Sequence, residues 1–532
     1  MCYNIKKMKG NTYTVLITAS GTSAKLGDFT KYTNKTLIRI GGKPAISYII
    51  EQYPKNTHFV ITLGHFADQV RDFLKLMYPK HTFTFVTVNK YEGKGSSLGY
   101  SMLQAAPHLQ KPFIYHASDT VVNEKIPKPT SNWIGGFQGM GSSNYTSFNI
   151  LNGKIQKILD KGIIDPDYLH IGLVGVYSFK FFWKYLQELY KGNQYGENLS
   201  DFHALNEMIV HGTDFSIKEY HSWYDIGNVD SLQVAREKLR DPFQILDKPK
   251  ESIYVMNKSV IKFFSDPKMI EQRVKRAKIL GNLVPKIKGY TKNYYTYDFV
   301  RGDLYADIAN PANFPDFLYW SFKNFWKPIR EVSDKEFKNI CYNFYYTKTK
   351  ERIQEFLKTR VLKDKETIIN DEKIPSVNTL LKNIDFNYLA DGRQFNFHGD
   401  FILDNIIKTK KGYTLLDWRQ SFGGLLKAGD IYYDLAKLNH NLVINHTVVN
   451  NNLFTINATD ENIICDILRK DSFVACQNIL FDIIKEKELD TKRVKLLTAI
   501  AWLNMSPLHV HPYDTFLFYF GKQALWRTLN EN

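Results

Sequence analysis

Asp400, Asn405 and Asp417 have the types and spacing that phosphoryl transfer requires. Asp400 and Asn405 precede, and Asp417 follows, a predicted hairpin of two short apolar strands with its turn at residues 408–412. If residue 406 pairs with 416, Asn405 faces Asp417 at about 5 Å, which suits two oxygen ligands of Mg²⁺. Asp400 could then accept the proton of a substrate hydroxyl while metal ions offset the charge of a γ-phosphate. An acidic hairpin with a capped loop explains this combination less well.

A second set of residues, near the N-terminus, could bind a triphosphate. A loop at residues 19–26 follows an apolar segment, and small residues let backbone N–H groups approach phosphate closely. A tight turn would also explain this loop taken alone. Two nearby lysines and a distant Asp-Ile-Gly at 225–227 favour nucleotide binding. The candidate ligands are Gly21, Thr22, Ser23, Lys25 and Lys35.

The elements that must position this loop alternate between strand and helix. Strands are predicted at 15–17, 58–63, 83–88 and 113–116, with helices from Pro44, around 70–74 and at 98–109. This alternation predicts an α/β, doubly wound parallel sheet, whose ligands bind beyond the carboxyl ends of the strands. The loop at 19–26 and Asp119, which follows the fourth strand, are therefore expected at the same edge.

The N-terminal segment resembles the nucleotidyltransferase family that includes sugar-1-phosphate nucleotidyltransferases and CTP:phosphocholine cytidylyltransferases. The family opens with Ala-Ala-Gly-x-Gly-Thr/Ser-Arg-Leu and continues to Pro-Lys. Here Ser23 replaces the second glycine, Lys25 the arginine and Asn34 the proline, whereas Lys35 is retained. The change from Arg to Lys removes a bidentate phosphate contact but keeps the charge. The resemblance implies a Rossmann-like, GT-A-like domain.

Three further segments extend this resemblance. Residues 93–99, with Gly95, Ser96 and Ser97, fall where the family recognises the base; 172–177 resembles its substrate-side strand; 223–228 resembles its Trp-x-Asp-x-Gly-Thr. The resemblance implies that Asp119 and Asp225 share a catalytic Mg²⁺. An acceptor phosphate would attack the α-phosphorus of CTP, or another nucleoside triphosphate, and release pyrophosphate. Asp160-Lys161 is a candidate for the acceptor side, although surface charges explain it nearly as well.

The segment around Asp400 resembles the choline kinase and aminoglycoside phosphotransferase family, a branch of the protein-kinase-like fold. The resemblance rests on His398-Gly-Asp400 with Asn405, on Leu416-Asp-Trp418 and on 429–435, about 40 residues in all. It implies a bilobal α+β domain that uses ATP. It also implies that Asp400 is the catalytic base, that Asn405 and Asp417 hold Mg²⁺, and that Asp430 braces the catalytic loop.

The residues before this motif complete the kinase interpretation. Lys262 lies on the second strand of a predicted hairpin, 253–264, and could reach nucleotide phosphates, with Glu271 on the next helix as its partner. An exposed strand lysine is the alternative. Asp298 lies in a segment that resembles the adenine-binding linker between lobes. If the acceptor is a quaternary amine, aromatic side chains could supply cation–π walls, although each alone is expected to be structural. They are Tyr432, Trp502, Tyr513 and Trp526.

The length and composition of the chain limit its possible domain organisation and partners. A chain of 532 residues predicts two domains, placed at 11–240 for the nucleotidyltransferase and 252–532 for the kinase, with a linker at 241–251. The net charge of +16 comes from scattered lysines, and no aromatic–basic platform indicates nucleic acid. No apolar run indicates a membrane span or signal peptide, so a cytoplasmic enzyme is expected. The four cysteines predict neither zinc nor disulfides.

The two motifs together predict consecutive reactions. A kinase makes a phosphomonoester and a nucleotidyltransferase consumes one. The leading hypothesis is a bifunctional enzyme that phosphorylates choline, an amino alcohol or a polyol with ATP and then transfers CMP from CTP. The product would be an activated precursor for surface polysaccharide or lipid synthesis. Alternatives are a sugar kinase coupled to a sugar-1-phosphate nucleotidyltransferase, or one catalytically silent half.

Overall fold

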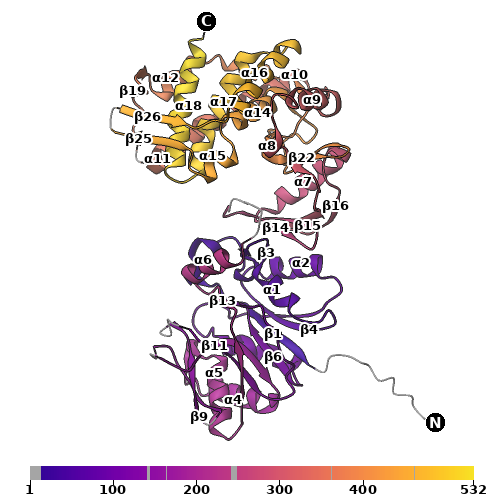
Figure 1. The fold of residues 1–532 in the computed structure, drawn as a ribbon, viewed down its shortest axis with the longest axis vertical. Helices are drawn as coiled ribbons and strands as arrows, with labels where there is room; N and C mark the ends of the chain where they lie inside the picture. The colour runs from indigo at the N-terminus through magenta and orange to yellow at the C-terminus, as the bar shows by residue number, and fades with distance from the viewer. Residues whose placement is uncertain are drawn as a thin grey trace, which may run out of the picture. The chain divides into compact units, whose positions relative to one another are not determined.

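A computed structural model describes residues 13–139, 144–151, 153–162, 165–240, 248–360, 362–459 and 462–531. The chain divides into two compact units (Figure 1). The first unit is Met1–Ile270 with Lys288–Tyr297, and the second is Glu271–Ile287 with Asp298–Asn532. Residues 241–247 of the predicted linker lie outside the described residues, so the domain boundary stays a prediction.

The first unit is built on a nine-stranded mixed sheet. Strands β6, β1, β4 and β5 run parallel in that spatial order, and β11 continues the sheet antiparallel to β6. The strands are β10 (Lys154–Leu159), β9 (Ser147–Leu151), β11 (Tyr168–Val176), β6 (Phe113–Ala117), β1 (Thr14–Ala19), β4 (His58–Leu63) and β5 (Thr82–Thr87), with β8 (Trp133–Phe137) and β12 (Ser216–Tyr220) beside β11. The predicted Rossmann-like α/β sheet is confirmed.

Strand alternation explains why this sheet is covered on both faces. Val15 and Ile17 of β1 belong to the core beneath α1 (Ala45–Glu51) and α2 (Ala67–Met77). Leu16, between them, belongs to the core beneath α3 (Leu98–Ala105), α4 (Phe179–Lys191) and α5 (Asp201–Val210). Successive side chains of a strand point to opposite faces, so an uninterrupted apolar strand needs helices on both sides.

The order of the parallel strands identifies the ligand-binding edge. From β1 the chain moves to β4 and β5 on one side and returns to β6 on the other. The chain therefore reverses direction across the sheet between β1 and β6. In open α/β sheets, ligands bind at the carboxyl ends of the strands that flank such a point. The loop that follows β1 and Asp119, which follows β6, lie there.

A small four-stranded sheet packs into the first unit. It contains β14 (Glu251–Met256), β15 (Ser259–Phe264), β17 (Tyr294–Asp298) and β16 (Ile287–Tyr290), in this order. The predicted hairpin is confirmed, with Tyr254 opposite Ile261. Phe73 of α2 contacts the rings of Tyr254 and Tyr294, each with a centroid separation of 5.7 Å. The sheet that the kinase resemblance assigned to the second domain therefore shares a core with the N-terminal unit.

The second unit is mainly helical (Figure 1). Helix α17 packs against both α14 and α18, and the hairpin β22 (Ile406–Thr409)–β23 (Gly412–Leu415) pairs with β18 (Asp303–Leu304). Its main helices are α7 (Pro267–Leu280), α9 (Phe314–Trp320), α10 (Asp334–Tyr342), α11 (Lys348–Arg360), α14 (Ile431–Val443), α16 (Asp471–Glu486), α17 (Thr491–Met505) and α18 (Tyr513–Leu529).

The region after Asp434 contains strands as well as helices. Strands β25 (Phe454–Ala458) and β26 (Asn462–Ile467) form a hairpin that pairs with β19 (Thr367–Ile369) and β20 (Glu372–Ile374). In α9, Phe314, Phe317 and Leu318 are buried in the core. No helix among the described residues is both long and apolar enough to cross a bilayer.

Candidate active sites

Asp119 and Asp225 converge at the predicted edge of the sheet. Strand β13 (Trp223–Asp225) pairs antiparallel with β7 (Thr120–Val122), which places Asp225 opposite Thr120. A Cβ atom added to Gly227 would lie 3.2 Å from Asp225 Oδ1 and 3.6 Å from Asp119 Oδ2, so both carboxylates border this glycine. Two carboxylates held together in this way are hard oxygen ligands that fit Mg²⁺.

The electrostatics of the two carboxylates differ. Burial acts to raise the pKa of Asp119, but the Lys35 ammonium, 2.9 Å from Asp119 Oδ2, more than offsets it, so the pKa is lowered. Burial and then the charge of Asp119 raise the pKa of Asp225. Adjacent like charges disfavour ionisation of both groups, and a bound cation relieves that repulsion. Lys35 already supplies one positive charge to this site.

Asn34, which stands where the resembling family has proline, positions Lys35. Its Nδ2 donates to the carbonyl oxygens of Ala19 (2.9 Å) and His65 (2.7 Å). Its Oδ1 accepts from the backbone N–H and the hydroxyl of Thr36 (3.0 and 2.8 Å). The side chain is fully buried and makes four hydrogen bonds. It therefore ties the ends of β1 and β4 to the start of the helical turn that carries Lys35.

A buried histidine supports the turn that presents Asp119. His116 Nδ1 lies 2.9 Å from the Tyr53 hydroxyl, and Nε2 lies 3.0 Å from the Thr120 carbonyl oxygen. Burial lowers the pKa of His116 to about 4, so the ring is neutral at pH 7. Because a carbonyl can only accept, Nε2 carries the proton and Nδ1 accepts from Tyr53. His116 thus stabilises the turn without titrating near neutrality.

The loop after β1 leaves room for a phosphate. A Cβ atom added to Gly21 would have no neighbour within 4 Å, and Thr22 beside it is half-buried. Ser23 adopts the left-handed conformation, with φ 54° and ψ 52°, which favours the glycine found in the resembling family. Lys25 is exposed, and Ser20 is tied to α3 by a 3.0 Å hydrogen bond to Ser101. These placements leave the predicted phosphate-binding role a prediction.

The predicted base-recognition loop ends on the N-terminus of α3. Gly93 and Gly95 both have positive φ, and Ser96 donates its N–H and hydroxyl to the Gly93 carbonyl. The Ser97 hydroxyl caps α3 by accepting from the Tyr100 N–H. Ser96 and Ser97 thus have structural roles in this conformation, and their contact with a base stays a prediction.

Partly buried aromatic rings adjoin Asp225. The ring of Trp223 lies 5.4 Å from that of Phe137 and 5.1 Å from that of Tyr145, whose hydroxyl donates to Asp225 Oδ2 (3.0 Å). Such a wall suits either the C–H face of a polyol or the methyl groups of an ammonium ion. Asp160 and Lys161, by contrast, form an exposed turn closed by their own 2.8 Å hydrogen bond.

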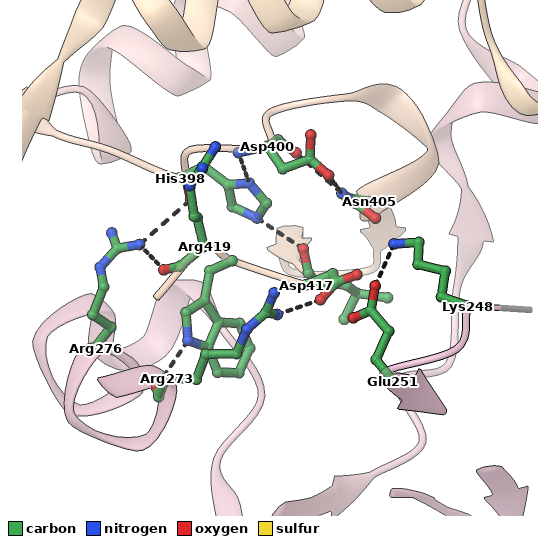
Figure 2. A network of polar contacts seen from close by, with 11 residues as sticks. Lys248, Glu251, Arg273, Arg276, His398, Asp400, Asn405, Asp417 and Arg419 are labelled. Atoms are coloured by element: carbon green, nitrogen blue, oxygen red, sulfur yellow. Dashed lines mark hydrogen bonds and ion pairs between the residues drawn. The ribbon is translucent and has the colours of Figure 1, made fainter. Parts of the chain in front are cut away.

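In the second unit the hairpin brings Asn405 close to Asp400, but its register differs from the prediction. Ile406 pairs with Leu415, and the Leu416 N–H donates to the Asn405 carbonyl (2.7 Å). Leu416 is therefore the residue opposite Asn405, and Asp417 lies one position further along the chain. The predicted register was wrong by one residue, because the turn of this hairpin contains two residues and not three. Asn405 Nδ2 donates to Asp400 Oδ2 (3.3 Å) and to the Asp400 carbonyl (3.0 Å), as Figure 2 shows.

Asp434, and not the predicted Asp430, braces the loop at residues 398–400. The Asp434 carboxylate accepts the backbone N–H groups of His398 and Gly399, both at 2.7 Å. Asp430 instead caps α14 and accepts from the Tyr345 hydroxyl (2.7 Å) and the Arg393 N–H (3.0 Å). Both carboxyls are buried, and burial raises the pKa of Asp434 to about 6. The motif contains two aspartates four residues apart, and the resemblance selected the wrong one.

A lysine that sequence reasoning missed contacts the predicted catalytic base. Lys437 Nζ lies 2.9 Å from Asp400 Oδ1, and its side chain is 11% exposed. Burial acts to raise the pKa of Asp400, but Lys437 outweighs it and lowers the pKa to about 2. Asp400 is therefore ionised at any pH near neutrality. The only sequence signal for Lys437 is its helical spacing of three residues from Asp434.

Helix α7 reaches the same loop through two arginines. Arg273 forms an ion pair with Asp417, which has φ 55° (Figure 2). Arg276 is fully buried and donates to the carbonyl oxygens of Phe397, Arg419 and Leu426. Burial lowers its pKa to about 9. The helix thus supplies positive charge at Asp417 and binds the strand ends around it.

Three predicted kinase residues lie elsewhere than expected or stay untested. Glu271 is largely exposed and pairs with Lys275 on the next helical turn (2.6 Å), which does not support the predicted pairing with Lys262. Helix α7 instead directs Arg273 and Arg276 toward the loop around Asp417. Lys262 is buried on β15, contrary to the exposed alternative, and its contact with ATP stays a prediction. Asp298 ends β17 at the surface.

The oxygen donors at both sites fit divalent cations. Asn405 directs its amide nitrogen to Asp400, which leaves its oxygen as the ligand atom, and Asp417 is already balanced by a cation, Arg273. Among the described residues, no group of three or more His, Cys, Asp or Glu side chains could hold a metal. Any ion here would therefore depend on two protein oxygens and on substrate phosphates, as is usual for Mg²⁺.

Comparison with known proteins gives fold-level neighbours only. No protein-family model matches the chain, and no curated protein matches it. The N-terminal region is similar to a CTP:phosphocholine cytidylyltransferase from Streptococcus pneumoniae, at 18% identity and a TM-score of 0.39, over 43% of this chain and 100% of that one. An inositol-1-phosphate CTP transferase from T. maritima is 16% identical, with a TM-score of 0.36, over 43% of this chain and 97% of that one. A UDP-glucose pyrophosphorylase complexed with UDP-glucose is 17% identical, with a TM-score of 0.37, over 42% of this chain and 97% of that one.

Proposed function

We propose that the first unit transfers a nucleotidyl group to a phosphomonoester. The observation that carries this proposal is the meeting of Asp119, Asp225 and Lys35 at the edge of the sheet where β1 and β6 end. An oxygen of the acceptor phosphate attacks the α-phosphorus of a nucleoside triphosphate, the bond to the β–γ unit breaks, and pyrophosphate leaves. Mg²⁺ held by Asp119 and Asp225 would supply charge stabilisation at the α-phosphate. Lys35 and Lys25 offset negative charge on the triphosphate.

We also propose that the second unit transfers the γ-phosphate of ATP to an alcohol. Support comes from Asp400, Asn405 and Asp417, gathered around one hairpin and braced by Asp434. With a pKa of about 2, Asp400 is a weak base. Its main role is to accept a hydrogen bond from the attacking hydroxyl and align it, and the proton follows as the bond to phosphorus forms. Asn405 and Asp417 would hold Mg²⁺, which offsets charge on the phosphates.

The two reactions fit one reaction sequence, because the proposed kinase reaction of the second unit makes the phosphomonoester that the nucleotidyl transfer of the first unit consumes. The predicted acceptors are choline, an amino alcohol or a polyol, with CTP as the nucleotidyl donor. The rival is a hexose kinase feeding a sugar-1-phosphate nucleotidyltransferase. A screen of choline, ethanolamine, glycerol and hexoses against each triphosphate separates them. Pyrophosphate release that requires a hexose 1-phosphate favours the rival.

Two substitutions test the halves separately. Asp225→Ala is expected to abolish pyrophosphate release and leave ADP formation intact, and Asp400→Ala is expected to do the reverse. An unchanged rate in either variant contradicts the assignment of the corresponding half, for which the alternative is a catalytically silent binding or scaffold module. A gel shift that weakens with salt would instead favour the reading as a non-specific nucleic-acid binder.

A further inference from the structure

Cationic side chains gather on one side of the Asp400 carboxylate. Its Oδ2 accepts from Asn405, and its Oδ1 contacts Lys437 of α14. One helical turn before Lys437, the hydroxyl of Tyr433 accepts a 3.0 Å hydrogen bond from Arg419 Nη1. A lysine therefore contacts the Asp400 oxygen that Asn405 does not, and an arginine from another segment is bonded to the same helix one turn earlier.

Two more cations extend this lining through the ring of Phe344. Lys348 Nζ lies 4.4 Å from the centroid of that ring, and the Arg419 guanidinium lies 5.4 Å from it. Arg352 follows Lys348 by one turn of α11. We call Lys348, Arg352, Arg419 and Lys437 the basic cluster. They come from α11, α14 and the segment after Asp417, so the fold and not a local run of lysines brings them together.

The charges of the basic cluster are incompletely balanced. Asp400 pairs with Lys437, and Glu355 pairs with Arg352 (3.0 Å). In the described part of the chain, neither Lys348 nor Arg419 has a carboxylate within ion-pair distance. Burial, followed by the charges of Arg419, Arg352 and Lys437, lowers the pKa of Lys348 to about 7. An anion bound among these side chains would offset that repulsion.

We propose that the acceptor alcohol of the second unit carries an anionic group, a carboxylate or a phosphate, which the basic cluster binds while the hydroxyl contacts Asp400. This inference rests on the proposed kinase function and narrows its acceptor. It disfavours choline, because a quaternary ammonium ion would meet four cations. The aromatic walls that choline would need are also occupied: Tyr432, Trp502 and Tyr513 are buried, and the Arg493 guanidinium lies 4.5 Å from the ring of Tyr432.

The chemistry of the step is unchanged by the acceptor's charge. The hydroxyl oxygen forms a bond to the γ-phosphorus of ATP, the bond between that phosphorus and the β–γ bridging oxygen breaks, and ADP leaves with the electron pair. The hydroxyl proton passes to Asp400 and then to water. Lys437, within hydrogen-bond distance of Asp400, can contact the acceptor's anionic group or the transferred phosphoryl group as negative charge accumulates there.

The test compares acceptors of similar size and different charge. ADP formation by the full-length protein is measured with D-glycerate, glycerol 3-phosphate, glycerol and choline. We expect kcat/KM for one of the two anions to exceed that for glycerol about tenfold or more, the size of one good charge-assisted contact. The carboxylate and phosphate arms distinguish the two sources of negative charge. Preference for choline over both anions overturns the proposal.

Charge-removing variants locate the effect in the basic cluster. Lys348→Gln and Arg419→Gln should each lower the ratio of kcat/KM for the preferred anion over glycerol about tenfold. Lys350→Gln, at an exposed position on the same helix, is the matched control and should leave the ratio unchanged. If the two variants raise KM for ATP and leave the ratio unchanged, the cluster serves the donor and the proposal is wrong.

A binding measurement separates this proposal from the kinase assignment. Isothermal titration with D-glycerate, glycerol 3-phosphate and choline needs no turnover. If no alcohol is phosphorylated but an anion binds and Lys348→Gln weakens it, the kinase function fails and the anion site stands. If alcohols are phosphorylated but neither anion binds more tightly than choline, the kinase function stands and the anion site fails.

Discussion

Asn34 and Asp434 show how single buried polar side chains hold the two sites in place. Asn34 ties the backbone beside Lys35 to the carbonyl oxygens of Ala19 and His65, and Asp434 accepts two backbone N–H groups beside Asp400. A buried polar group left without its partner costs about 1–3 kcal/mol, so such residues tolerate little change. Their side-chain types are visible in the sequence, but their partners come from distant segments, and no spacing rule identifies them.

Asp434 is expected to make the stability of the second unit depend on pH. A buried acid whose pKa is raised to about 6 holds its proton more tightly when folded than when unfolded. Between pH 4 and 6 the folded state therefore binds more protons, and stability falls as pH rises, by up to about 3 kcal/mol. Urea denaturation at several pH values in this range should show that the free energy of unfolding of the natural protein falls with pH relative to that of Asp434→Asn. If the difference in the free energy of unfolding between the two proteins does not change with pH, the pKa of Asp434 is not raised.

The same substitution should impair the proposed kinase. Asn at position 434 presents an NH₂ group to one of the loop N–H donors, which leaves that donor unsatisfied and releases the turn at Gly399. ADP formation should fall more than tenfold, since a small displacement of a catalytic group is costly. Pyrophosphate release by the first unit serves as the internal control and should not change.

Ser23→Gly should stabilise the loop after β1. The left-handed conformation costs a non-glycine residue about 1–2 kcal/mol, part of which is offset by the greater freedom of glycine in the unfolded chain. We expect a net gain of roughly 0.5–1 kcal/mol in the free energy of unfolding. Ala24→Gly, one residue later in the 3₁₀ turn, is the matched control and should destabilise. Equal effects would mean that the backbone at 23 is unstrained.

At the scale of elements, the predictions that held were those with a local cause. Strand β4 was predicted to the residue because its six residues, four of them apolar, lie between turn residues, and β14–β15 was found because its two strands adjoin. The convergence of Asp119 with Asp225, across about a hundred residues, could not be predicted from spacing and came only from resemblance. The hairpin register failed because it depends on one turn residue. The basic cluster has no local signature at all.

The small sheet should affect nucleotidyl transfer through the segment that carries Lys35. The Tyr254 hydroxyl of β14 donates to the Leu37 carbonyl (2.6 Å), two residues after Lys35. Tyr254→Phe leaves that buried carbonyl without this partner, at a cost of about 1–3 kcal/mol. We expect a several-fold higher KM for the triphosphate in pyrophosphate release. Tyr290→Phe, on the exposed side of β16, is the control; equal effects of the two variants would exclude this coupling.

At the scale of the whole molecule, the first unit extends past the predicted linker. Tyr254, Met256, Ile261, Phe263 and Tyr294 share one core with α1 and α2. Each such side chain contributes about 1.5–3 kcal/mol when fully buried. A fragment that ends at residue 250 should therefore melt at a lower temperature and precipitate more readily than one that ends at 297. Equal melting temperatures would show that the small sheet contributes nothing to the first unit.

This shared core bears on how such a chain could arise or be rebuilt. Where a polar linker joins two domains, recombination can exchange one domain for another with little loss of stability. Here an exchange at residues 241–251 would remove the small sheet from the apolar side chains of α1 and α2 with which it shares a core. Engineers who wish to exchange the second unit should therefore keep the small sheet with the first unit and residues 271–287, which carry Arg273 and Arg276, with the second.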